Sequence, residues 1–177
     1  MANRLYYIRR RVKFLLQRHR SSGLTCIARG FISSCLPRLL HNKNLPLLEK
    51  WKIQTILEYA SDLPVEELSK IKNYVHKNVK ENIQLYNLII VNESVIGCVL
   101  VRPYKDGHLL DEIYLESAYR NQGIGTSIIC DILKQYAVVY LWVYKKNYKA
   151  IRLYKRLGFE VSEETETRYL MKAENIL

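Results

Sequence analysis

The sequence has no hydrophobic run long enough to cross a membrane and no apolar core of a secretory signal peptide. Its four cysteines do not fall at metal-ligand spacings, and its four histidines do not cluster with them, so no metal is predicted. Repeats and low-complexity tracts are also missing. We therefore expect a cytoplasmic, globular chain of 177 residues, in which Cys98 and Cys130 act as small buried hydrophobes.

Acidic residues are nearly absent from the first part of the chain. Residues 1–52 contain 12 Lys or Arg and one acid, Glu49, so this part carries the whole net charge of +11. Residues 53–177 contain 16 basic and 16 acidic residues and are neutral. A charge this lopsided makes an anionic partner credible for the first part of the chain.

The basic part has apolar residues at helical spacing over 3–20 and over 24–41, followed by an expected linker at 42–46. This pattern predicts a basic helical extension over 1–50, preceding a domain over 51–177. Four roles are open for the extension. It could pack on the domain as a structural hairpin, bind RNA, lie on an anionic membrane surface and make the protein peripheral to the membrane, or serve as a targeting segment.

The stretch 120–126, Arg-Asn-Gln-Gly-Ile-Gly-Thr, lies between an apolar run at 109–115 and a helical pattern at 124–136. A strand that turns through glycines into a helix creates an anion site, because backbone N–H groups converge at the positive end of the helix dipole. Gly123 and Gly125 let a phosphate approach the backbone. Two glycines alone are weak support, because they are also common in ordinary turns.

A second segment, 147–159, follows another apolar strand at 138–143. Asn147 is expected to cap a helix, and Gly158 to end it in the left-handed conformation. Asn147 and Tyr154 are seven residues apart and lie two turns apart on one helical face. In isolation such a tyrosine would be read as a core residue.

Together the two segments resemble those of the GCN5-related N-acetyltransferase (GNAT) superfamily. Arg120 to Gly125 match its motif Arg/Gln-x-x-Gly-x-Gly/Ala, and Asn147 to Phe159 match its Asn-x-x-Ala-x-x-x-Tyr-x-x-x-Gly-Phe segment without a gap. The resemblance covers about residues 51–172. It implies an α/β fold, with a mixed central sheet that has helices on both faces, preceded here by the basic helical extension. The expected strands are 52–59, 86–91, 95–101, 108–115, 138–143, 159–161 and 168–172, and the helices are 63–80, 124–136 and 147–157.

The resemblance implies acetyl-CoA as co-substrate and no metal. Main-chain groups near Ile113 and Leu115 would pair with its pantetheine arm, and amides of the glycine turn would hold its pyrophosphate. The implied binding residues are Ile113, Leu115, Arg120, Asn121, Gln122, Gly123, Ile124, Gly125, Thr126 and Asn147.

By resemblance, Tyr154 is the general acid, since a phenol with a pKa near ~10 is neutral at pH 7. The base is open. Leu109 stands where many family members carry Glu, which puts a direct carboxylate base in doubt. Asp111 points to the same face as Leu109 and is the candidate, while Glu112 points to the other face unless a bulge shifts the register. An amine that enters already neutral needs no base.

The implied function is acetyl transfer from acetyl-CoA to a primary amine of a small molecule, peptide or protein, through a direct ternary complex. Two alternatives stay open, namely a toxin that acetylates aminoacyl-tRNA and a non-catalytic acetyl-CoA-binding module. The acceptor amine is unknown. Glu163, Glu164 and Glu166 could attract a cationic amine or form an ordinary solvated turn. A homodimer is compatible with the resemblance, since dimers are common in the superfamily.

Overall fold

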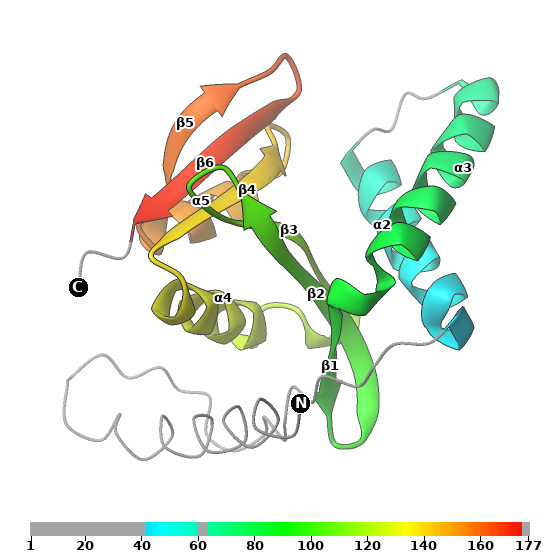
Figure 1. Ribbon diagram of the computed structural model, residues 1–177, viewed down its shortest axis with the longest axis horizontal. Coiled ribbons are helices and arrows are strands. Elements are labelled where there is room, and N and C mark those ends of the chain that lie inside the picture. The colour runs from blue at the N-terminus through cyan, green and yellow to red at the C-terminus, as the bar shows by residue number, and fades with distance from the viewer. Residues whose placement is uncertain (1–41, 60–63, 175–177) are drawn as a thin grey trace.

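The computed structural model describes residues 42–59 and 64–174 (Figure 1). The basic helices expected over 3–20 and 24–41 lie outside these residues. The four roles considered for this extension therefore stay predictions. Within the described ranges, no helix is both long and apolar enough to cross a bilayer.

Six strands form one mixed sheet in the order β1-β2-β3-β4-β6-β5. All neighbouring strands are antiparallel except β3 and β4, which are parallel. The strands are β1 (Tyr86–Val91), β2 (Ser94–Tyr104), β3 (Gly107–Leu115), β4 (Val138–Tyr144), β5 (Glu160–Glu164) and β6 (Arg168–Glu174). Each expected strand from residue 86 onward is confirmed, with ends shifted by a few residues.

Helices cover both faces of the sheet, as the resemblance implied (Figure 1). On one face, α2 (Leu45–Tyr59) and α3 (Val65–Asn82) pack over Leu100 of β2. On the other face, α4 (Ile124–Gln135) and α5 (Tyr148–Arg156) pack over Val99. Adjacent residues of a strand point to opposite faces, so β2 supplies two separate apolar cores. Short 3-10 turns at Asn42–Asn44, Ile83–Leu85 and Ser117–Tyr119 connect the elements.

The strand expected at 52–59 is wrong, because these residues form the second half of helix α2. Leu48 and Trp51, three residues apart on one helical face, are buried against Val75 and Val79 of α3. The linker expected at 42–46 is also wrong, since α2 already begins at Leu45. The expected boundary between residues 50 and 51 therefore falls inside a helix.

Candidate active site

The parallel strands β3 and β4 pair over only three residue pairs, which end at Leu110 and Leu141. Beyond that point, Ile113 and Leu115 pair with β2, and Val143 pairs with β6. The two strands therefore separate, and we call the gap between their C-terminal halves the fork. In the described chain, the fork-facing edge of β3 has no strand partner beyond Leu110, so its peptide groups can bind an extended ligand.

A β-bulge in β3 lies where the fork begins. Leu110 pairs with Val101 and Glu112 pairs with Leu100, so Asp111 is the extra residue. Leu110 faces the core under α4 and α5, whereas Glu112 contacts Lys52 of α2 on the other side of the sheet. A regular strand would have put Leu110 and Glu112 on the same face. The bulge thus bends the strand and, beyond it, reverses which residues point to each face of the sheet.

Because of the bulge, Asp111 and Glu112 both turn to the α2 side of the sheet. Asp111 accepts a hydrogen bond from Arg102 Nε at 2.8 Å. Arg102 lies two residues after Leu100 in β2, so both point to the same face of the sheet. Asp111 therefore keeps the face that we expected for it. We expected Glu112 on the opposite face unless a bulge shifted the register. The structure contains such a bulge, so Glu112 faces α2 as well.

Glu112 is the most buried carboxylate among the described residues, at 8% exposed. Its Oε2 accepts hydrogen bonds from the Tyr86 hydroxyl at 2.7 Å and from Lys52 Nζ at 3.0 Å. Its Oε1 is also buried and has no hydrogen-bond partner in the described chain. Burial, followed by the charge of Glu112, raises the pKa of Tyr86 far above its ordinary value. Oε2 is thus held by two donors, while Oε1 lies buried without a donor in the described chain.

The glycine turn leads from β3 into α4 with two residues in the left-handed region, Asn121 at φ 61° and Gly123 at φ 82°. Gly123 is the residue before the helix, and no side chain caps its first turn. A Cβ at Gly123 would have no atom within 4 Å, and one at Gly125 would meet only Leu115 Cδ1 at 3.6 Å. The amides of Gly125 and Thr126 belong to the first turn of α4, where N–H groups have no acceptor within the helix.

Other members of the turn support it from within. Ile124 is buried against Ile89 and Ile96 and fixes the start of α4. Gln122 Nε2 donates to the carbonyl of Ala118 at 2.8 Å, which closes the turn on itself. The Ile124 side chain is therefore structural, and only its backbone is available to a ligand.

Arg120 is engaged in contacts that the sequence did not predict. Its Nε donates to the carbonyl of Leu115 at 2.8 Å, and its Nη1 lies 3.4 Å from Glu58 of α2. Its guanidinium carbon also lies 5.5 Å from the centre of the Tyr114 ring. Arg120 thus ties the turn to α2, and at 36% side-chain exposure it can still attract an anion.

Helix α5 begins and ends as expected. The Oδ1 of Asn147 accepts a hydrogen bond from the amide of Ala150 at 3.1 Å, and Gly158 is left-handed at φ 87°. Tyr154 is buried, at 9% exposed, and packs with Phe159. Burial, with a smaller contribution from Tyr59, raises the pKa of Tyr154 to about 12.

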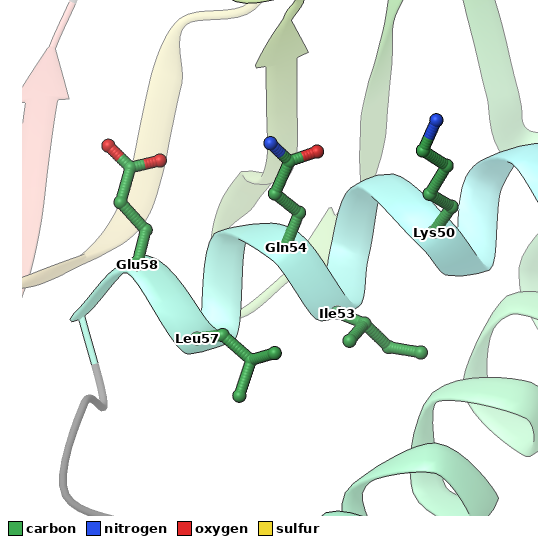
Figure 2. Close-up of a pocket in the computed structure, with 5 residues that line it drawn as sticks. All are labelled: Lys50, Ile53, Gln54, Leu57 and Glu58. Carbon is green, nitrogen blue, oxygen red and sulfur yellow. The ribbon is translucent and has the colours of Figure 1, made fainter.

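Helix α2 bridges the fork. Its Lys52 contacts Glu112 on β3, and its last residue, Tyr59, stacks on Tyr144 of β4 with ring centres 5.7 Å apart. Beside this helix lies a hollow of about 660 Å³, lined by Lys50, Ile53, Gln54, Leu57 and Glu58. Figure 2 shows Lys50, Gln54 and Glu58 on one side of α2, with Ile53 and Leu57 on the other. Gln54 accepts a hydrogen bond from the Tyr114 hydroxyl at 2.9 Å.

Two of the three acids named for the β5–β6 hairpin are paired with lysines. Glu163 forms an ion pair with Lys105, and Glu164 forms one with Lys145. Both acids are exposed. These pairs favour the ordinary solvated turn over a dedicated amine site.

The described residues contain no group of three His, Cys, Asp or Glu that could hold a metal ion.

The model of the acetyltransferase (GNAT) family matches residues 49–159, which is more than half of the chain. The chain belongs to the GNAT family. The match includes the fork, the glycine turn and α5. It also includes α2 from residue 49 onward, and α2 occupies the place where the resemblance implied a first strand.

Relatives of this GNAT chain agree with the fold. An uncharacterized N-acetyltransferase of Methanocaldococcus jannaschii is 42% identical over 60 residues, which is 30% of this chain and 26% of that protein. The matched part thus spans about a quarter of this relative's length. A PaiA N-acetyltransferase of Thermoplasma acidophilum, solved with coenzyme A, aligns at a TM-score of 0.64 and 18% identity over 78% of this chain and 97% of that one. Naa50 of Arabidopsis thaliana, solved with the bisubstrate analogue CoA-Ac-MVNAL, aligns at 0.55 and 22% identity over 78% and 97%.

Sequence reasoning missed the contribution of α2 and β1 to the site of this GNAT chain. Lys52, Gln54, Glu58 and Tyr59 were assigned to a strand, and Tyr86 had no assigned role. The spacing of Leu48, Trp51 and Thr55 is a helical signal that could have identified α2. Nothing in the sequence around Tyr86 marks it as a partner of Glu112, because that contact depends on the strand register.

Proposed function

We propose that this protein transfers an acetyl group from acetyl-CoA to a primary amine, in a complex that holds both substrates at once. The observation that supports this most directly is the fork. It opens beside an uncapped helix N-terminus on one side and a buried tyrosine, Tyr154, on the other. Few other activities need an unpaired strand edge, an anion-binding turn and a neutral acid together.

The residues present fit acetyl-CoA. The open space around Gly123 and Gly125 leaves a cradle that a side chain would fill. The amides from Gln122 to Thr126 would hold the pyrophosphate, with Asn121 and Arg120 beside them, since a helix N-terminus favours phosphate. Peptide groups near Ile113 and Leu115, together with Asn147, would hold the pantetheine arm. Bound acetyl-CoA supplies the acetyl group as an activated thioester.

Tyr154 is suited to give a proton to the sulfur that leaves. With its pKa raised to about 12, its hydroxyl carries a proton throughout the neutral range. Its burial in the core between the sheet and α5 also shields the side chain from bulk water. A Tyr154 hydroxyl that acts in this way affects the rate and leaves cofactor affinity unchanged.

For the base, the structure offers two neighbouring carboxylates, Asp111 and Glu112. Asp111 is already bound to Arg102 and is partly exposed. Glu112 presents a buried Oε1 without a partner, beside the fork. We therefore assign proton acceptance to Glu112 and keep Asp111 as the competing assignment. The cation Lys52, 3.0 Å from Glu112, also disfavours a protonated amine nearby.

The acceptor amine would approach beside α2, where the hollow of about 660 Å³ combines apolar Ile53 and Leu57 with polar Gln54 and Glu58. A mixed lining of this kind suits a short peptide or a small amine. The bisubstrate analogue bound by Naa50 carries a peptide, which makes peptides the first acceptors to test.

The test uses acetyl-CoA labelled in its acetyl group, a cell extract, and fractionation of the label into protein, small molecules and RNA. We expect label in protein or small molecules with the wild type and a large loss with Tyr154→Phe. Label in RNA would instead support the aminoacyl-tRNA alternative. Label that is absent, or independent of Tyr154, would leave only a non-catalytic acetyl-CoA-binding module.

A further inference from the structure

A second hollow, of about 550 Å³, lies between the glycine turn and α5. Its lining consists of Asn121 from the turn and four cations from the helix, Lys149, Arg152, Lys155 and Arg156. The family motifs do not involve these four side chains. Arg152, Lys155 and Arg156 are exposed, and so is Lys149.

The charge in this hollow is unbalanced. The nine residues of α5 include the four cations and no acid. In the described chain, none of the four forms an ion pair, whereas other lysines do, such as Lys145 with Glu164. The hollow is therefore a site of concentrated positive charge within a domain whose total charge is zero.

Helix stability does not explain this arrangement. Lys149 lies in the first turn, where the positive end of the helix dipole repels a cation. Arg152 lies three residues from Lys149 and four from Arg156, and like charges at these spacings destabilise a helix. Only Lys155 and Arg156, in the last turn, are placed favourably for the helix itself. An anionic ligand would offset the repulsion among all four.

The hollow adjoins the phosphate cradle through Asn121. This residue precedes Gly123 by two positions in the same turn and is left-handed at φ 61°. A ligand whose pyrophosphate lies on the α4 amides would extend past Asn121 toward α5. Coenzyme A carries a further phosphate on the 3′-oxygen of its ribose, only a few bonds from that pyrophosphate.

We propose that the cationic face of α5 binds the 3′-phosphate of coenzyme A and makes the protein select the phosphorylated coenzyme over dephospho-coenzyme A. The inference rests on the proposed function, because it assumes that coenzyme A occupies the turn. A phosphate monoester carries up to two negative charges, which matches a cluster of Lys and Arg better than any single ion pair would. RNA could also be attracted to these cations, but a concave site of this size beside the cradle favours a small ligand.

The experiment measures the dissociation constants of coenzyme A and dephospho-coenzyme A by isothermal titration calorimetry on the full-length protein. We expect the wild type to bind coenzyme A about tenfold more tightly, as charge-assisted contacts to one phosphate would give. The double variant Lys149→Ala/Arg152→Ala should lose most of this preference, while its affinity for dephospho-coenzyme A stays unchanged. Alanine favours helix formation, so α5 should persist in the variant.

The matched control is Lys77→Ala/Lys80→Ala, which removes two exposed cations at the same spacing from α3, on the other face of the sheet. This control should keep the wild-type preference. For the wild type alone, the preference should shrink as salt rises from 0.05 M to 0.5 M, because the four cations are exposed.

Equal affinity of the wild type for the two ligands would overturn the inference and leave the proposed function intact. Failure to bind either ligand would overturn the proposed function as well. A double variant that weakens both ligands equally would also overturn the inference, since it would show general attraction and no recognition of the 3′-phosphate. The inference would also be overturned if the double variant kept its preference for coenzyme A over dephospho-coenzyme A but lost binding to transfer RNA.

Discussion

Lys52 of α2 and Glu112 of β3 form a buried ion pair, with Nζ 3.0 Å from Oε2, although sixty residues separate them in the chain. The pair fastens the bridging helix to the sheet at the point where the fork opens. It also leaves the second carboxylate oxygen of Glu112 buried and unpaired in the described chain. Four predictions test this site.

The first prediction distinguishes the two acids. Glu112→Gln should reduce turnover by about a hundredfold or more, since it removes the proton acceptor. It should also lower the free energy of unfolding by about 3 kcal/mol, because Lys52 is left buried without its partner. Turnover per folded molecule and urea denaturation measure the two effects separately.

Asp111→Asn is the control for that variant. Its ion pair with Arg102 is partly exposed, so the change in stability should stay within about 1 kcal/mol, and turnover should change little. If Asp111→Asn abolished turnover and Glu112→Gln did not, the base would be Asp111, the candidate that strand alternation from Leu109 suggested.

The second prediction concerns stability at high pH. Burial and the charge of Glu112 raise the pKa of Tyr86 well above its value in the unfolded chain. Above about pH 10 the unfolded state loses this proton and the folded state keeps it, so stability falls as pH rises, by at most about 1.4 kcal/mol per pH unit. Urea denaturation between pH 8 and pH 11 should show a steeper loss for the wild type than for Tyr86→Phe.

Tyr74 provides the comparison, since it is exposed on α3 and has 60% of its surface accessible. Tyr74→Phe should follow the wild-type curve across the same pH range. Parallel curves for the wild type and Tyr86→Phe would show that Tyr86 ionises equally easily in both states.

The third prediction concerns the general acid. Tyr154→Phe should lower kcat by at least about a hundredfold, the usual contribution of a positioned acid, while the dissociation constant of acetyl-CoA stays nearly the same. Because the pKa of Tyr154 is raised to about 12, kcat should show no alkaline loss from this group below about pH 11. Steady-state kinetics and calorimetry measure the two quantities.

Tyr148→Phe is its matched control, because Tyr148 lies on the same helix but is 69% exposed. That variant should retain wild-type kcat. A wild-type kcat for Tyr154→Phe would remove Tyr154 from the mechanism.

The fourth prediction separates binding from stability at the glycine turn. Gly125 lies in the first turn of α4 without a positive φ, and a Cβ there meets only Leu115 Cδ1 at 3.6 Å. Gly125→Ala should therefore raise the free energy of unfolding by up to about 1 kcal/mol, as glycine is a poor helix former. One methyl group should leave acetyl-CoA binding nearly unchanged, because the family motif also accepts alanine at this position. The branched side chain of Gly125→Val should instead obstruct the cradle and weaken acetyl-CoA binding, which calorimetry would detect.

Unchanged acetyl-CoA affinity in Gly125→Val would show that the pyrophosphate does not lie on these amides. Ile124→Val is the companion variant. It shortens a side chain buried beneath the turn, so it should cost about 1 kcal/mol of stability while leaving the dissociation constant nearly unchanged.

The sequence by itself determined the features that depend on neighbouring residues. The left-handed Gly158, the Asn147 cap and the start of α4 all follow from contiguous residues, because turns and caps are set by local backbone preferences. The same holds for every strand from residue 86 onward, whose apolar patterns are bounded by turn residues.

Only the tertiary structure decided how distant segments combine. The spacing of Leu48 and Trp51 is helical, but only the tertiary structure decided that this helix packs against α3. The bulge at Asp111 set which acids face α2, since one extra residue reverses the alternation of a strand. Glu112, Lys52 and Tyr86 meet only because the sheet register and the path of α2 bring them together, and hydrogen bonds between distant residues leave no periodic trace in the sequence.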